Sequence, residues 1–160
     1  MLCPALPIGC YPPHNWAVVV INEGMGGFMR ALSLELRHLI YTALLLAVIW
    51  VPYILAHIAQ VGPVVAFSYP ERVEMPDWAA RLKRAHYNLV ENVPLFAIAV
   101  IAGEFRGIHT GVTAACAMVF FWARVAHPVA VVFNIFGTRT AVFNVGWVAV
   151  VVYLFVVLTA

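Results

Sequence analysis

Four long apolar stretches follow one another along the chain, separated by short polar segments. They cover residues 39–59, 78–102, 108–133 and 140–160. Each is long enough to cross a bilayer as a helix, which takes about 20 residues. Runs such as VAVVVYLFVVL lack the alternation of a membrane β-barrel strand. Because only helices and closed barrels satisfy their backbone in lipid, the pattern predicts an all-α protein with four transmembrane helices.

The connections between these predicted helices are short. They comprise residues 60–77, 103–107 and 134–139. Loops of this length predict an up-down-up-down bundle whose first and third loops lie at the same end. Leu34 is expected to begin a helix that leads into the first span, and Asp77 to cap the second. Pro52 and Pro94 should kink the first and second spans.

Composition supports a membrane protein. Of 160 residues, 64% are hydrophobic and 10% are charged, against about 45–50% and about 25% in soluble domains. This excludes a soluble enzyme, a disordered chain and a secreted disulfide scaffold. Three cysteines and no metal-ligand spacing argue against a metal site, and a net charge of +2 argues against nucleic-acid binding. The expected partner is therefore the lipid bilayer.

The first residues do not fit the pattern of the rest. Residues 1–28 contain four prolines and an apolar run, residues 16–21, that is too short to span a bilayer. We expect two parts, an N-terminal extension over residues 1–28 and a four-span domain over residues 29–160. The extension is either a mis-assigned start, with Met25 or Met29 as the true first residue, or an interfacial arm.

The basic residues give an expected orientation. Five lie at the ends of the first and third loops, namely Arg72, Arg81, Lys83, Arg84 and Arg139. Three lie at the other ends of the spans, namely Arg30, Arg37 and Arg106. Because Lys and Arg accumulate on the cytoplasmic side, the count predicts that the first and third loops are cytoplasmic.

One face of the predicted second helix carries a polar stripe. At about 100° per residue, Arg81, Arg84, Asn88 and Glu91 fall within an arc of roughly 80°. The stripe extends about 15 Å along the helix. Charged residues inside a span are expensive and by default mark function.

Further polar residues are expected at the same end of the bundle. Arg124 and His127 are neighbours on one face of the third span, and Arg139 and Thr140 open the fourth. With the stripe, they predict a pocket for a small anionic molecule rich in amides, because arginine binds carboxylates through paired hydrogen bonds. In the alternative, Glu91 and Arg124 neutralise one another and the other basic groups reach the lipid headgroups.

Two segments carry a resemblance to a known family. The stretch RLKRAHYNLVENVPLF, residues 81–96, is followed by ARVAHPVAVVFNIFGTRTAVF, residues 123–143. The pattern R-x-x-R-x-H-x-N-x-x-E and the later R-V-A-H resemble the membrane-associated proteins in eicosanoid and glutathione metabolism (MAPEG). The resemblance runs from about Leu34 to the C-terminus. It implies a four-helix protomer in a homotrimer, with glutathione held between neighbouring protomers near the cytoplasmic side.

The resemblance also implies roles for individual residues. Those expected to bind glutathione are Arg81, Arg84, Asn88, Glu91, Arg124 and His127. Arg139 and Thr140 match the Arg-Ser pair that steadies the thiolate in eicosanoid-type members. The implied activity is that of a glutathione transferase or peroxidase acting on lipophilic electrophiles or lipid hydroperoxides.

The sequence departs from the eicosanoid-type pattern at several positions. Tyr87 stands where those members have Arg, and Val131 and Phe143 stand where they have Tyr. The first span also has no Arg to receive a carboxylate. These departures favour a second hypothesis, in which the protein is a non-catalytic membrane scaffold, a lipid-binding protein or an accessory subunit of a larger complex.

Overall fold

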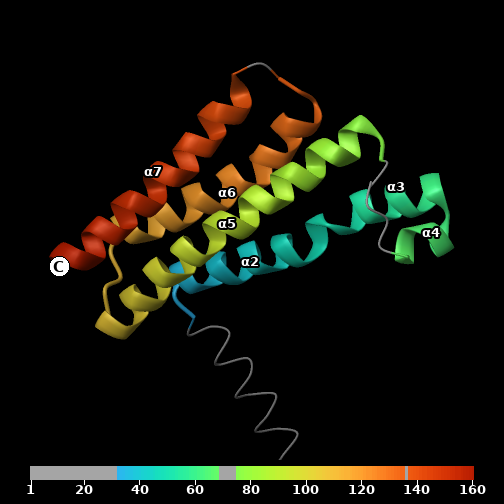
Figure 1. Ribbon diagram of the computed structural model, residues 1–160. Coiled ribbons are helices and arrows are strands. Elements are labelled where there is room, and N and C mark those ends of the chain that lie inside the picture. The colour runs from blue at the N-terminus through green and yellow to red at the C-terminus, as the bar shows by residue number, and fades with distance from the viewer. Residues whose placement is uncertain (1–31, 69–74, 136) are drawn as a thin grey trace, which may run out of the picture. The chain divides into compact units, whose positions relative to one another are not determined.

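The computed structural model describes residues 32–68, 75–135 and 137–160. The chain divides into two units, residues 1–32 and 33–160, and the fold below is that of the second. The expected extension over residues 1–28 and Arg72 lie outside the described residues. The helices are α2 (Leu34–Ile49), α3 (Val51–Val61), α4 (Pro63–Phe67), α5 (Asp77–Arg106), α6 (Gly111–Val132) and α7 (Thr138–Thr159) (Figure 1).

The four predicted spans are confirmed. Four helical segments are long and apolar enough to cross a membrane, and the described residues contain no strand. α2 and α3 together form the first span, which is interrupted at Trp50, two residues before Pro52. A break is expected there because proline cannot donate the backbone hydrogen bond that a continuous helix requires. The protein is thus an all-α membrane bundle of four spans.

The ends of the helices differ from the predicted boundaries. Asp77 is not the N-cap of α5 as expected, because Pro76 occupies that position and Asp77 is the first helical residue. A carboxylate in the first turn still faces the positive end of the helix dipole. α5 continues through Pro94 and ends at Arg106, and the Gly107 that caps it has a left-handed φ of 64°, which suits glycine.

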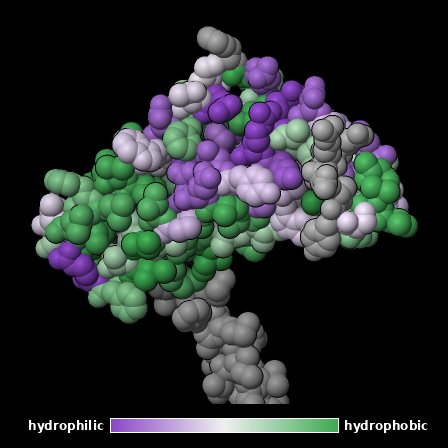
Figure 2. Space-filling model, in the orientation of Figure 1, coloured by the Kyte–Doolittle hydropathy of each residue, from purple (hydrophilic) through white to green (hydrophobic). Residues whose placement is uncertain are grey.

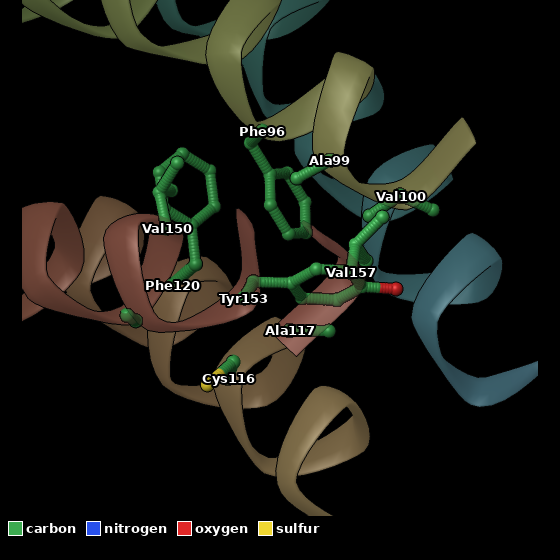
Figure 3. Packing of buried hydrophobic residues seen from close by; sticks show 10 residues of the cluster. Phe96, Ala99, Val100, Cys116, Ala117, Phe120, Val150, Tyr153 and Val157 are labelled. Carbon is green, nitrogen blue, oxygen red and sulfur yellow. The ribbon is translucent and has the colours of Figure 1, made fainter. Parts of the chain in front are cut away.

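The packed interior joins α5, α6 and α7. Phe96 of α5 stacks on Phe120 of α6 with ring centroids 4.1 Å apart, and both rings are fully buried (Figure 3). Ala99 and Ala117, also fully buried, let the helix backbones approach closely, which is how helices associate in lipid. This interior fixes the rotation of α5 and therefore the direction of its polar stripe.

A second polar cluster, which the sequence analysis did not anticipate, lies where α2 and α6 begin. Glu35 is only 3% exposed and accepts a hydrogen bond from Thr113 Oγ1 at 2.6 Å. His109 lies 3.8 Å from a carboxylate oxygen of Glu35 and 3.8 Å from one of Glu104, and Ser33 Oγ donates to Glu104. The cluster ties the start of α2 to the end of α5 and the start of α6. Its contacts join side chains 71 and 78 residues apart in sequence, so no local pattern predicts it.

Candidate functional site

The predicted site residues gather at one end of the bundle, as the topology required. The start of α5 and the connection between α6 and α7 lie at the same end (Figure 1). In the same orientation, hydrophilic side chains concentrate over this end, whereas the surface toward the end of α7 is mostly hydrophobic (Figure 2). The predicted polar site is therefore localised to one end of the bundle.

A cavity of about 230 Å³ opens among these helices. It is lined by Arg81, Arg84, Ala85, Asn88, His127, Ala130, Val131, Asn134, Ile135 and Arg139. Five of the eight predicted site residues are in this set. Three arginines, two asparagines and a histidine supply its polar groups, and none of the described residues lining it is acidic. Such a lining favours an anionic ligand that also accepts hydrogen bonds from amides.

Local contacts hold the cavity walls in place. Arg81 Nε donates to the carbonyl oxygen of Val132 at 3.1 Å, which fastens the start of α5 to the end of α6. Asn92 Nδ2 donates to the carbonyl oxygen of Asn88 at 2.7 Å. Asn134 has a φ of 51° and Gly137 one of 73°. These left-handed residues flank the tight connection between α6 and α7 and so place Arg139 at the cavity.

Arg124 does not line the cavity but lies inside the bundle. It is 2% exposed, and none of its guanidinium nitrogens has a hydrogen-bond partner among the described residues. The guanidinium carbon lies 4.8 Å from the ring centroid of Phe120 and 5.3 Å from that of Phe143. The alternative in which Glu91 and Arg124 neutralise one another is therefore wrong within a single described chain.

Glu91 and Thr140 also lie outside the cavity lining. Both are exposed on the surface of the single chain. Glu91 is close to the middle of the 30-residue helix α5, about 21 Å along the axis from Asp77. An exposed carboxylate at that depth of a spanning helix is expensive in contact with lipid.

The departures noted in the sequence have clear structural positions. Val131 is buried and lines the cavity, and Phe143 lies 6.3 Å from the His127 ring, centroid to centroid. Tyr87 is exposed. His86, by contrast, is engaged elsewhere, since its Nδ1 is hydrogen-bonded to Tyr53 Oη at 2.8 Å and so links α5 to α3.

Two residues of this region were not predicted from the sequence. Asn134 lines the cavity but lies in a loop, where helical periodicity gives no information. Gly146, a buried helical glycine of α7, faces the Arg124 guanidinium. Its isolated position in an apolar run gave no signal. Within the described residues no group of His, Cys, Asp and Glu side chains could hold a metal ion.

Comparison with models of known protein families shows to which family the chain belongs. The sequence model of the MAPEG family matches residues 38–159. The chain belongs to the MAPEG family. The matched segment contains all eight predicted site residues of this MAPEG protein, including the three that lie outside the cavity lining. Comparisons with curated proteins and with solved structures give no match.

Proposed function

We propose that this MAPEG protein is a homotrimeric membrane enzyme that binds glutathione at the polar cavity. The proposed activity is transfer of glutathione to lipophilic electrophiles or reduction of lipid hydroperoxides. The observation that carries the proposal is the convergence of Arg81, Arg84 and Arg139 with amide groups around one cavity in which no described lining residue is acidic. Three cations that converge on one cavity of a spanning bundle favour an anionic partner.

The residues at the cavity suit the groups that glutathione carries. Its two carboxylates match the guanidinium groups of Arg81 and Arg84, which can form paired hydrogen bonds with a carboxylate. Its peptide groups match the side-chain amides of Asn88 and Asn134. Its ammonium group needs an acidic partner, and we assign this role to Glu91, one turn further along the same helix from Asn88.

Two observations support completion of the site by a second copy of the chain. The cavity of about 230 Å³ is smaller than the roughly 300–1,000 Å³ typical of ligand pockets. Glu91 is exposed in the middle of α5, where contact with a neighbouring protomer would remove it from lipid. A trimer in which these α5 faces meet their neighbours accounts for both features. The loops at the cavity end are proposed to be cytoplasmic on the basis of the Lys and Arg count.

The chemistry assigned to this chain is stabilisation of negative charge on sulfur. Bound glutathione supplies a thiol, which becomes a strong nucleophile when it is deprotonated. Arg139 at the cavity wall would stabilise the thiolate, because a cation placed beside developing negative charge favours that charge. Thr140, in the first turn of α7, is placed to assist only if a neighbouring copy completes the site.

A non-catalytic function is the second candidate. The observation that favours it is the absence of a hydroxyl or thiol side chain among the described residues lining the cavity, where Val131 replaces an expected tyrosine. In this hypothesis the protein keeps the fold and an anion-binding cavity but acts as a lipid-binding scaffold or an accessory subunit.

One experiment on the purified protein separates these candidates. Glutathione at 100 times its dissociation constant should raise the free energy of unfolding by about 2.7 kcal/mol, measured as a higher thermal midpoint in detergent. Conjugation of a dinitrohalobenzene and reduction of a fatty-acid hydroperoxide should both exceed the rate without protein. Stabilisation without catalysis would favour the scaffold. No stabilisation and no catalysis would refute the proposed function.

A further inference from the structure

Three residues surround the Arg124 guanidinium. Phe120 and Phe143 each place an aromatic ring within 5.3 Å of it. On α7, Gly146 leaves the space that the guanidinium occupies. A Cβ at this position would lie 2.8 Å from a terminal nitrogen of Arg124 and 3.1 Å from the guanidinium carbon. The charge can occupy this place only if residue 146 has no side chain.

Gly146 is not explained by backbone conformation. It lies inside α7, away from the positive-φ glycines at helix ends. Alanine is a better helix former than glycine by intrinsic propensity, so the glycine weakens the helix unless it serves packing. The atoms nearest to the missing Cβ belong to Arg124 and to the side chain of Ala123. The guanidinium atoms, at 2.8 and 3.1 Å, are nearer than the Ala123 Cβ at 3.2 Å, so the guanidinium sets the tightest limit on residue 146.

The Arg124 guanidinium lies next to the cavity wall. His127 is one turn from Arg124 on the same helix, is 5% exposed and lines the cavity. Phe143 is shared by both residues, since its ring lies 5.3 Å from the Arg124 guanidinium carbon and 6.3 Å from the His127 ring. The guanidinium has no hydrogen-bond partner among the described residues. Its field is therefore not cancelled by a paired carboxylate among the residues that the structure describes, and low polarity around it makes that field stronger.

We propose that Gly146 is a positioning residue: it leaves room for the Arg124 guanidinium, and the charge of Arg124 strengthens anion binding in the adjacent cavity. This inference rests on the anion-binding role of the cavity stated under the proposed function. Arg124 acts through space from behind His127 and Phe143, while the cavity arginines contact the ligand. Gly146 thereby sets ligand affinity without touching the ligand.

The substitution Gly146→Ala tests this proposal because it moves the charge while sparing the fold. The two closest atoms belong to the far end of the flexible Arg124 side chain, which can shift within the bundle, while the Cβ of Ala123 at 3.2 Å needs to move by only a few tenths of an ångström. Affinity for glutathione, measured by calorimetry in detergent, should fall about fivefold, as expected when a unit charge moves a few ångströms. Gly103→Ala is the matched control. It adds the same methyl group at a buried helical glycine but meets the Tyr153 hydroxyl at 3.1 Å instead, and it should leave the affinity unchanged.

A double-mutant cycle distinguishes positioning from a general packing effect. In an Arg124→Met background, Gly146→Ala should change affinity less than twofold, because the charge that it displaces is gone. Arg124→Lys combined with Gly146→Ala should recover part of the loss, since lysine keeps the charge with a smaller head. An unchanged affinity in Gly146→Ala, or an equal loss in the Arg124→Met background, would overturn the proposal.

A second probe separates this inference from the proposed function. The same cycle is measured with inorganic phosphate, which tests anion binding without requiring glutathione. If wild-type protein binds phosphate but not glutathione, the proposed function fails, and coupling between Gly146 and Arg124 in phosphate affinity still supports the positioning role. If wild-type protein binds neither anion, both are wrong.

Discussion

Replacing Arg139 by alanine is expected to lower the turnover number for glutathione conjugation by about 10²- to 10³-fold. This is the size of effect seen when one preorganised group that stabilises an anion is removed. Arg139 lines the cavity from the first turn of α7, so its loss removes a fixed cation from the proposed thiolate position. Because the other cavity arginines remain, KM for glutathione should change less than tenfold. Steady-state kinetics with a dinitrohalobenzene in detergent would measure both parameters.

Two further variants control this prediction. Arg37→Ala removes an exposed arginine from the first turn of α2, at the opposite end of the bundle from the cavity, and should leave both parameters unchanged. Arg139→Lys should retain part of the turnover because it keeps the charge but not the planar fork. A similar turnover number in wild type and Arg139→Ala would exclude the assigned role of Arg139.

Replacing Arg84 by alanine is expected to weaken glutathione binding by about 10- to 100-fold. Arg84 extends into the cavity from the second turn of α5, where we propose that it binds a carboxylate. Hydrogen bonds to charged groups contribute about 1.5–3 kcal/mol, which converts to this range of affinity. Isothermal titration calorimetry on the purified variant would measure the dissociation constant.

The contrast between binding and turnover makes this prediction specific. Arg84→Ala should mainly raise the dissociation constant, whereas Arg139→Ala should mainly lower turnover. Arg84→Lys should recover less than the full affinity, because a single ammonium group cannot donate two parallel hydrogen bonds to one carboxylate. Wild-type affinity in Arg84→Ala would mean that the ligand binds outside this cavity.

Much of the fold follows from hydrophobic length and loop length alone. Four apolar stretches separated by short loops leave few arrangements for a chain in lipid, so the four spans were predictable. The residues at which the helices begin and end were less predictable, because helix ends depend on individual contacts. Asp77 is a good N-cap by residue type, but the chain enters the helix one residue earlier, at Pro76. The polar contacts of Glu35 join distant segments and leave no local pattern.

The site was predictable where periodicity governs direction and unpredictable where packing does. Arg81, Arg84 and Asn88 share a helical face and line one cavity, as the spacing indicated. Glu91 shares that face but lies beyond the cavity, because the cavity ends within the first turns of α5. Arg124 is one turn from His127, yet its long side chain folds back against Gly146 rather than into the cavity. The direction of the Arg124 side chain is set by packing and is visible only in the structure.

Native mass spectrometry of the protein released from detergent tests the central claim most directly, because it reports stoichiometry and bound ligand together. With millimolar glutathione in the sample, we predict a complex of three chains that carries up to three glutathione molecules. The same complex of Arg84→Ala should remain trimeric and lose the bound mass, whereas that of Arg37→Ala should keep it. A wild-type protein that carries no glutathione, or one that retains it equally in Arg84→Ala, would contradict the assignment of this cavity as a glutathione site.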